Sequence, residues 1–105
     1  MCKEDYAKAQ PYFEKAIKVF PRFALAYNNL GRTQFELGQY QKALESFDKA
    51  IKYDPELMEA YYYLGTTQVA LKQRNSAVAT FRTCVNKNPQ DFYATKCQER
   101  MKIIK

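Results

Sequence analysis

The sequence predicts an all-α fold, a superhelix of about six antiparallel helices, and three observations support this prediction. A segment of the chain repeats itself at a spacing of 34 residues. Within each copy, apolar residues recur every three or four positions, which is the spacing of one helix face. Residues that favour turns separate the two helical stretches of a copy. A fixed period of this length indicates one small unit stacked on copies of itself.

The repeat is clearest between residues 24–57 and 58–91, which are identical at eleven of 34 aligned positions. Unrelated stretches of ordinary composition would agree at about two positions. The identical pairs are Ala26/Ala60, Tyr27/Tyr61, Leu30/Leu64, Gly31/Gly65, Thr33/Thr67, Gln34/Gln68, Leu37/Leu71, Gln39/Gln73, Ala43/Ala77, Phe47/Phe81 and Pro55/Pro89. Residues 5–23 also match residues 39–57 at nine of 19 positions, so half a copy precedes the two full copies.

The first expected helix covers residues 6–20 and corresponds to the second helix of a full unit. Pro11 lies in its early turns, where few backbone N–H groups have partners within the helix, so the helix tolerates it. No first helix precedes this one, and we expect apolar residues such as Phe13 and Ile17 to be exposed. We therefore expect a fragment of a longer repeat protein; the alternative is that another chain supplies the missing helix.

Each full unit is expected to form a helix, a turn and a second helix. In residues 24–57, Tyr27 and Leu30 belong to one apolar stripe, and Ala43 and Phe47 belong to the next. Both stripes advance in three- and four-residue steps, so each unit pairs two helices through their apolar faces.

Turn residues delimit these helices. Gly38 lies between the two stripes, where the end of a helix needs a residue that tolerates positive φ. Asp54 is then expected to N-cap the following helix, with Pro55 at its first position. The second full unit, residues 58–90, has the same layout, but Lys72 replaces the turn glycine. We expect that helix end to be less tightly specified.

The last helix is expected over residues 91–104, with Asp91 as its N-cap. Its register places Glu99 where the full units have Gly31 and Gly65. A glutamate at this position obstructs a further partner helix, so the segment is expected to cap the stack with a polar outer face. The polar residues of that face are Gln98, Glu99 and Lys102. The residues expected to pack inward are Ala94, Cys97, Met101 and Ile104.

Two sets of residues carry a resemblance to a known family. They are Tyr27, Leu30, Gly31, Ala43, Phe47 and Pro55 in the first full unit, and Tyr61, Leu64, Gly65, Ala77, Phe81 and Pro89 in the second. This pattern resembles the tetratricopeptide repeat (TPR). The resemblance implies one TPR domain over residues 1–105, with a half repeat (6–20), two full repeats (24–57 and 58–90) and a capping helix (91–104). Gln34 and Gln68 depart from it, because the family favours tyrosine there.

The resemblance also implies where a partner binds. In TPR arrays the first helix of each unit lines a concave groove that holds a peptide or a helix of another protein. The side chains that this face offers here are Asn28, Asn29, Arg32, Tyr62, Tyr63, Thr66, Tyr93, Lys96 and Arg100. Amides satisfy an extended backbone, tyrosines supply contact area at low entropic cost, and the cations pair with carboxylates.

One TPR subtype can be tested from the sequence. TPR domains that hold chaperone tails clamp two carboxylates with lysines, an arginine and asparagines on successive first helices. Asn29 matches one of these asparagines, but Glu59 and Tyr63 stand where a lysine and an arginine are needed. We therefore do not expect a chaperone-tail clamp.

No residue pattern indicates catalysis. The chain has no histidine, which removes the usual general base and the commonest metal ligand. No phosphate-binding loop or nucleophile motif is present, so we expect no enzyme, cofactor or metal. Of the three cysteines, Cys84 is expected in the core, Cys97 in the core or the groove, and Cys2 in a frayed terminus. The absence of a long apolar run or a signal-peptide layout favours a cytoplasmic location.

The net charge of +6 is confined to one end of the chain. Residues 1–71 carry nine basic and nine acidic residues, whereas residues 72–105 carry eight basic and two acidic ones. A basic end attracts acidic peptides, nucleic acid or membrane surfaces; the alternative is an ordinary solvated helix face.

These observations favour a non-enzymatic module that binds a peptide or helix of a partner protein, and the basic end favours an acidic partner. The first alternative is self-association or helix exchange through the uncovered first helix. Nucleic-acid binding with Tyr93 as a stacking residue is less favoured, because the cations are spread around helices and no nucleic-acid motif is present. No membrane partner is expected.

Overall fold

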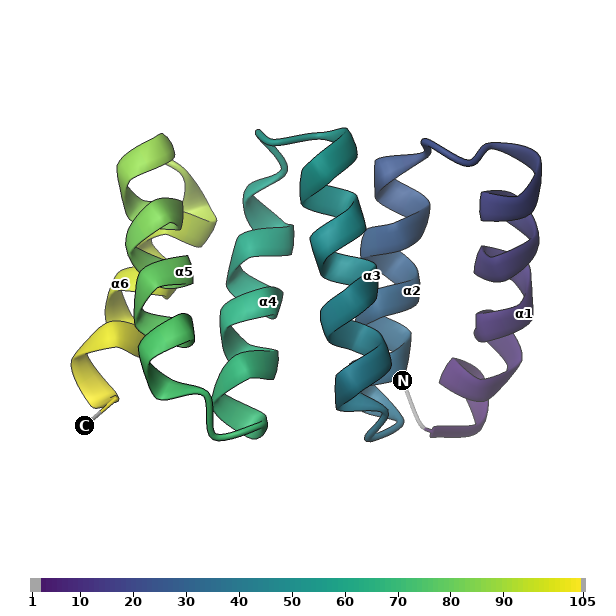
Figure 1. The fold of residues 1–105 in the computed structure, drawn as a ribbon, viewed down its shortest axis with the longest axis horizontal. Helices are drawn as coiled ribbons and strands as arrows, with labels where there is room; N and C mark the ends of the chain where they lie inside the picture. Colours follow the sequence, from purple (N-terminus) through teal and green to yellow (C-terminus); the bar gives the residue numbers. More distant parts are fainter. Residues whose placement is uncertain (1–2, 105) are drawn as a thin grey trace.

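The computed structural model describes residues 3–104, and within them it contains six α-helices and no strand. The helices are α1 (Lys3–Val19), α2 (Ala24–Glu36), α3 (Tyr40–Tyr53), α4 (Met58–Ala70), α5 (Arg74–Lys87) and α6 (Phe92–Ile103). They stand side by side in chain order and alternate in direction (Figure 1). The all-α stack expected from the repeat is confirmed.

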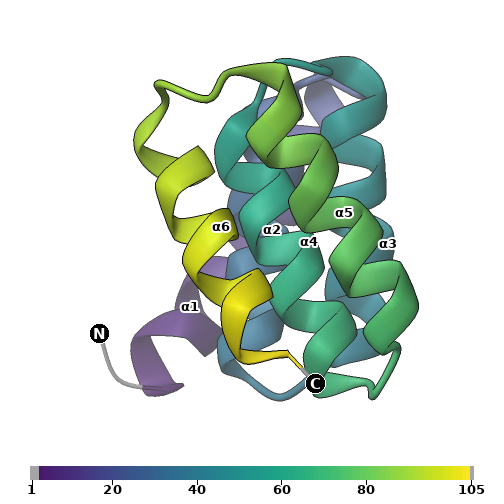
Figure 2. The same ribbon diagram turned by 90° about the vertical axis from the view of Figure 1, so that its left-hand side faces the viewer.

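The helices form two layers. The backbones of α2 and α4 approach one another, as do those of α4 and α6, whereas no Cα atom of α3 lies within 8 Å of one of α5. Seen along the stack, α3 and α5 lie on one side of α4, and α6 lies on the other (Figure 2). The first helices of successive units therefore share one face, which we call the α2–α4–α6 face.

The repeated glycines allow the two helices of each unit to approach closely. A Cβ atom on Gly31 would lie 2.7 Å from Cε1 of Phe47, and a Cβ on Gly65 would meet the ring of Phe81 in the same way. Both rings are completely buried. The repeated motif is therefore a contact between a ring and a bare helix backbone, formed once in each unit.

A second contact recurs in both units and was not expected from the sequence. The hydroxyl of Ser46 donates a hydrogen bond of 2.6 Å to Oε1 of Gln34, and the hydroxyl of Thr80 donates one of 2.7 Å to Oε1 of Gln68. This explains why glutamine is accommodated where the family favours tyrosine. The amide reaches a hydroxyl group on the second helix of its own unit, so its carbonyl oxygen is satisfied.

Helix α1 differs from the expectation in two respects. It begins at Lys3, so Pro11 lies in the middle of the helix and not in its early turns. Proline has no N–H, and the carbonyl that it leaves unpaired belongs to the exposed Ala7, where water can reach it. Phe13 and Ile17 are half-buried against α2, so the expectation that they lie exposed is wrong. They pack there because α2 covers one side of α1.

The apolar side chains that α1 does expose lie on its other side. Tyr12 is 75% exposed, Val19 61% and Phe20 62%. In the equivalent helix α3, Ser46 and Tyr53 occupy the positions of Tyr12 and Val19, and α2 covers them. The uncovered surface of α1 is thus the side on which the full units carry a first helix.

The turn at Asp54 and Pro55 also differs from the expectation. Asp54 ends α3, and its Oδ1 accepts a hydrogen bond of 3.1 Å from the backbone N–H of Glu56. Helix α4 starts only at Met58. Pro55 is therefore a turn residue, because an aspartate that bonds to the backbone two residues on favours a turn at this point. Asp91, in contrast, caps α6 as expected, since its Oδ1 accepts from the N–H of Tyr93 at 2.8 Å.

Lys72 adopts the left-handed backbone conformation that Gly38 adopts at the equivalent turn. Its φ is 62°, close to the 77° of Gly38. The hydrogen bonds that follow are also equivalent: the N–H groups of Gln39 and Gln73 each donate to the carbonyl five residues earlier at 2.8 Å. The two helix ends are alike, so the lysine bears a conformational cost that the glycine avoids.

The substitution Lys72→Gly should therefore stabilise the protein. The left-handed conformation costs a residue with a Cβ about 1–2 kcal/mol, and the freedom of glycine in the unfolded chain offsets about half of this. We expect a gain of about 0.5–1 kcal/mol in the free energy of unfolding, measured by urea denaturation. Gly38→Ala is the matched control and should lose a similar amount, because no atom lies within 4 Å of its added Cβ. A lower midpoint for Lys72→Gly would contradict this account.

Helix α6 packs through one side only. Ala94 and Cys97 are buried, Met101 and Ile104 pack beside them, and the outer residues are exposed as expected: Gln98, Glu99 and Lys102. Cys97 lies in the core and forms a disulfide with Cys84 of α5, with the two Cα atoms 6.4 Å apart. Cys84 is buried, as expected, and Cys2 lies outside the described residues. None of the helices in residues 3–104 has both the length and the apolar character needed to cross a membrane.

Candidate functional site

The residues expected to bind a partner lie on α2, α4 and α6, whose contacts place them on one side of the stack. All of them except Asn28 are partly exposed: Asn29, Arg32, Tyr62, Tyr63, Thr66, Tyr93, Lys96 and Arg100. The three helices present these residues because each one turns its apolar side toward α3 or α5, which leaves the opposite side open.

Aromatic rings form the centre of the α2–α4–α6 face. The ring centroids of Tyr62 and Tyr63 are 5.1 Å apart, and those of Tyr62 and Tyr93 are 5.8 Å apart. Tyr63 in turn stacks on the buried ring of Phe47 at 5.9 Å. These rings are held by one another and by the core, so they lose little conformational freedom when a partner covers them.

Three cations lie over these rings. The guanidinium carbon of Arg32 is 4.9 Å from the ring centroid of Tyr63. Lys96 and Arg100 both lie 5.9 Å from the ring centroid of Tyr62, and Nε of Arg100 donates a hydrogen bond of 3.4 Å to its hydroxyl. Cation–π contacts of this kind fix the positions of the charges while leaving them open to a partner.

Glu59 of α4 binds two side chains of α2. Its Oε1 accepts hydrogen bonds from Nδ2 of Asn28 at 3.1 Å and from Nη1 of Arg32 at 3.0 Å. Its carboxylate also lies close enough to the phenol of Tyr93 on α6 to raise the pKa of that group. The sequence marked Glu59 as a departure from the clamp pattern, but its contacts with Asn28 and Arg32 depend on inter-helix distances that no sequence spacing reveals.

Asn28 and Thr66 direct their polar groups to partners within the protein. Asn28 is only 1% exposed, so its amide supports Glu59 from beneath and does not lie open to a partner. Its Oδ1 has no hydrogen-bond partner within the described residues. The hydroxyl of Thr66 donates to the carbonyl of Tyr62 in its own helix at 2.9 Å. The open side chains of the face are therefore mainly aromatic and basic.

The phenol groups of Tyr63 and Tyr93 remain neutral at physiological pH. Burial raises the pKa of Tyr63, and the nearby Arg32 opposes part of this rise. Burial also raises the pKa of Tyr93, with the carboxylate of Glu59 acting in the same direction. Both hydroxyls therefore act as hydrogen-bond donors and acceptors without charge. Within residues 3–104, no group of three or more acidic or cysteine side chains is placed to hold a metal ion.

This geometry defines a class of protein: a short α-solenoid of helix pairs that presents the first helix of each pair on one open face. Family models of the tetratricopeptide repeat match residues 3–23, 24–57 and 59–91. The chain therefore belongs to the tetratricopeptide repeat family, as its repeated residues indicated. No curated protein gives a significant match when whole sequences are compared.

Several solved structures have the same fold. The Arabidopsis OM64 TPR domain is 28% identical with a TM-score of 0.85, and the match covers 94% of this chain and 82% of that one. The TPR2B domain of yeast Sti1, in its complex with pHsp70, is 25% identical with a TM-score of 0.87. This match covers 95% of this chain and 82% of that one. The first TPR of Spaghetti (RPAP3), bound to the HSP90 peptide SRMEEVD, is 19% identical with a TM-score of 0.84 and coverages of 94% and 79%, a likeness that concerns the fold alone.

Proposed function

We propose that this chain is a non-enzymatic interaction module whose α2–α4–α6 face binds a peptide or helix of a partner protein. The observation that carries the proposal is the set of half-exposed rings of Tyr62, Tyr63 and Tyr93, held in place by the core. Aromatic side chains with a fixed orientation and a polar end are typical hot spots of protein interfaces. The similar TPR2B domain of yeast Sti1, which forms a complex with pHsp70, supports peptide binding as the kind of function.

The charges of the face favour an acidic partner that is held differently from a chaperone tail. Glu59 and Tyr63 occupy the positions at which the clamp pattern requires cations, and Glu59 already forms an ion pair with Arg32. A partner carboxylate at this point would meet a like charge. The acidic residues of a partner are better matched by Lys96 and Arg100 on α6. On this face these two cations contact the ring and hydroxyl of Tyr62, and not a carboxylate.

The substitution Tyr63→Ala tests the proposal. The partner is first recovered by affinity capture with the wild-type protein, and its affinity is then measured by calorimetric titration. Tyr63→Ala should weaken binding by about 2 kcal/mol, because it removes a ring at the centre of the face. Tyr12→Ala is the matched control, since Tyr12 is exposed on α1 and should leave the affinity within about 0.5 kcal/mol.

A second substitution separates contact from long-range attraction. Arg100→Ala should mainly reduce the salt dependence of binding, because charges at an interface edge act over a screening length of about 10 Å at 0.1 M salt. If neither Tyr63→Ala nor Arg100→Ala changes the affinity, the α2–α4–α6 face is not the binding surface.

Self-association is the second candidate, and the exposed side of α1 favours it. Tyr12, Val19 and Phe20 expose apolar surface where the full units carry a first helix. If this surface is a contact, the average mass should rise with protein concentration in light scattering, and Val19→Glu should abolish the rise. A wild-type protein that stays monomeric at millimolar concentration would exclude this candidate.

A further inference from the structure

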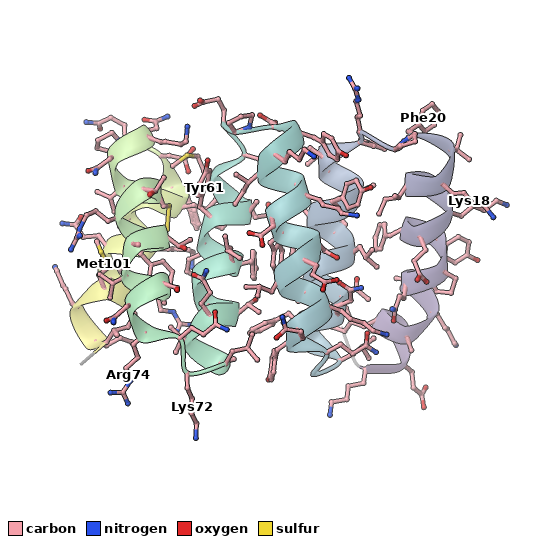
Figure 3. All side chains as sticks on the ribbon, in the orientation of Figure 1. Lys18, Phe20, Tyr61, Lys72, Arg74 and Met101 are labelled. Atoms are coloured by element: carbon pink, nitrogen blue, oxygen red, sulfur yellow. A yellow bond between two sulfur atoms is a disulfide. The ribbon has the colours of Figure 1, made fainter. Side chains whose placement is uncertain are left out.

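A cavity of about 690 Å³ lies where α4 and α6 end and α5 begins. Its lining residues are Val69, Lys72, Arg74, Arg100, Ile103 and Ile104. Figure 3 shows Lys72 and Arg74 projecting at the lower edge of the molecule, below Met101. The face described above does not include this cavity, although Arg100 belongs to both.

The lining combines two chemical characters. Val69, Ile103 and Ile104 supply an aliphatic surface, of which Ile103 is 67% exposed. Lys72, Arg74 and Arg100 carry positive charges, and none of the described residues of the lining is an aspartate or a glutamate. Exposed aliphatic surface next to several like charges costs free energy when it is left in water, and it is typical of a binding site.

We propose that this cavity binds an acidic amphipathic segment of a partner protein, with a large aliphatic side chain in the cavity and carboxylates against Lys72 and Arg100. The inference rests on the proposed function, because it places one part of the same partner. Carboxylates match Lys72 and Arg100, and a leucine or isoleucine side chain matches the aliphatic part of the lining. The cavity lies in the part of the chain that carries the net positive charge, residues 72–105.

Nucleic acid fits the same cavity less well. Proteins that bind single strands stack the bases on aromatic side chains, and the apolar part of this lining is entirely aliphatic. A phosphate backbone would use the cations and leave the aliphatic surface uncovered. An acidic peptide with an aliphatic centre uses both.

Arg100 links the cavity to the α2–α4–α6 face. Its Nε lies 3.4 Å from the hydroxyl of Tyr62, while its side chain also lines the cavity. A partner that crosses the rings of Tyr62 and Tyr93 can therefore continue into the cavity without leaving the protein surface. The cavity would then fix the direction of the partner, since its acidic aliphatic segment must lie at the ends of α4 and α6.

The probe for a test is a synthetic hexapeptide, acetylated and amidated, with two central leucines flanked on each side by a glutamate and an aspartate. It is short enough to occupy the cavity alone. In one control peptide asparagine and glutamine replace the acidic residues, and in a second control peptide alanines replace the leucines. A single-stranded oligothymidylate is the nucleic-acid control. Binding is followed by fluorescence anisotropy and by the methyl NMR signals of Val69, Ile103 and Ile104.

Lys72→Gly is the decisive variant, because it removes one cation while the stability of the fold is expected to rise. The acidic leucine peptide should bind this variant roughly three- to tenfold more weakly, and it should lose a similar factor when its acids become amides. Lys18→Gln, a change of one charge on the distant α1, should leave its affinity within about twofold. The methyl signals of the lining should shift only with the leucine peptides.

Other results of the same binding measurements would overturn the inference or separate it from the proposed function. The cavity is not the site if the acidic peptide fails to bind, if the amide peptide binds equally well, or if oligothymidylate binds more tightly and displaces the peptide. An effect of Tyr63→Ala on the natural partner without any effect of Lys72→Gly would retain the proposed function and reject the cavity. The reverse pattern would retain the cavity and reject the rings as the binding surface.

Discussion

Replacing Phe81 by alanine should lower the free energy of unfolding by about 3–5 kcal/mol, the range for removing a fully buried aromatic side chain. Phe81 is completely buried and fills the space beneath the bare backbone of Gly65. The lost contacts cannot be recovered, because α4 and α5 are held apart by the remaining core. Chemical denaturation measures the loss, and Phe92→Ala is the control, since Phe92 is 60% exposed and its removal should cost less than about 1 kcal/mol.

The glycine that faces this ring provides a coupled test of the same contact. In a helix, alanine is favoured over glycine by about 1 kcal/mol, so Gly65→Ala would stabilise an isolated helix. Here its Cβ would lie 2.7 Å from Cζ of Phe81, so we expect a net destabilisation. In the background of Phe81→Ala the same change should become neutral or favourable. Additive effects of the two substitutions would contradict the contact.

The second large effect is expected for Leu64→Ala, at about 2–5 kcal/mol. Leu64 is buried and packs with Ala43 and Phe47 of the preceding unit, so its removal leaves a cavity between two units. Leu25→Ala makes the same chemical change in a neighbouring helix, where the side chain is 50% exposed, and should cost less than about 1 kcal/mol. Equal losses for Leu64→Ala and Leu25→Ala would mean that the register of the repeat is wrong.

The sequence was sufficient to predict those parts of the fold that depend on local spacing. The pairs Gly31 with Phe47 and Gly65 with Phe81 recur at one interval, which indicates the same helix-to-helix contact in both units. The left-handed residue at Gly38 and the cap at Asp91 follow from chemistry within a few residues of the chain. Local rules were sufficient because both partners in each case lie in one helix–turn–helix unit.

The sequence was insufficient where two local rules compete or where distant residues meet. Asp54 and Pro55 satisfy the rules for a helix start and for a turn equally well, and only the position of α4 decides between them. The sequence left open whether Cys97 lies in the core or in the groove. Cys97 occupies the repeat position of Tyr63, whose ring stacks on the preceding helix α3, and it turns toward its own preceding helix, α5. Glu59 of α4 binds Asn28 and Arg32 of α2, a contact that depends on how the units are stacked.

The unequal burial along the stack has a consequence for how the protein opens. Helix α1 contains no fully buried residue, and α2 is its one packing neighbour among the described helices. In a linear array a helix is stabilised only through the helices beside it, so α1 should separate from the rest at a lower free energy than global unfolding. Its amide hydrogens should exchange with solvent well before those of α3 and α4. Helix α6 is held more firmly than α1. It contacts both α4 and α5, and the disulfide between Cys84 and Cys97 joins it to α5. We therefore expect opening to be concentrated at the α1 end, while α4 and α6, which carry the rings of Tyr62, Tyr63 and Tyr93, stay folded longer.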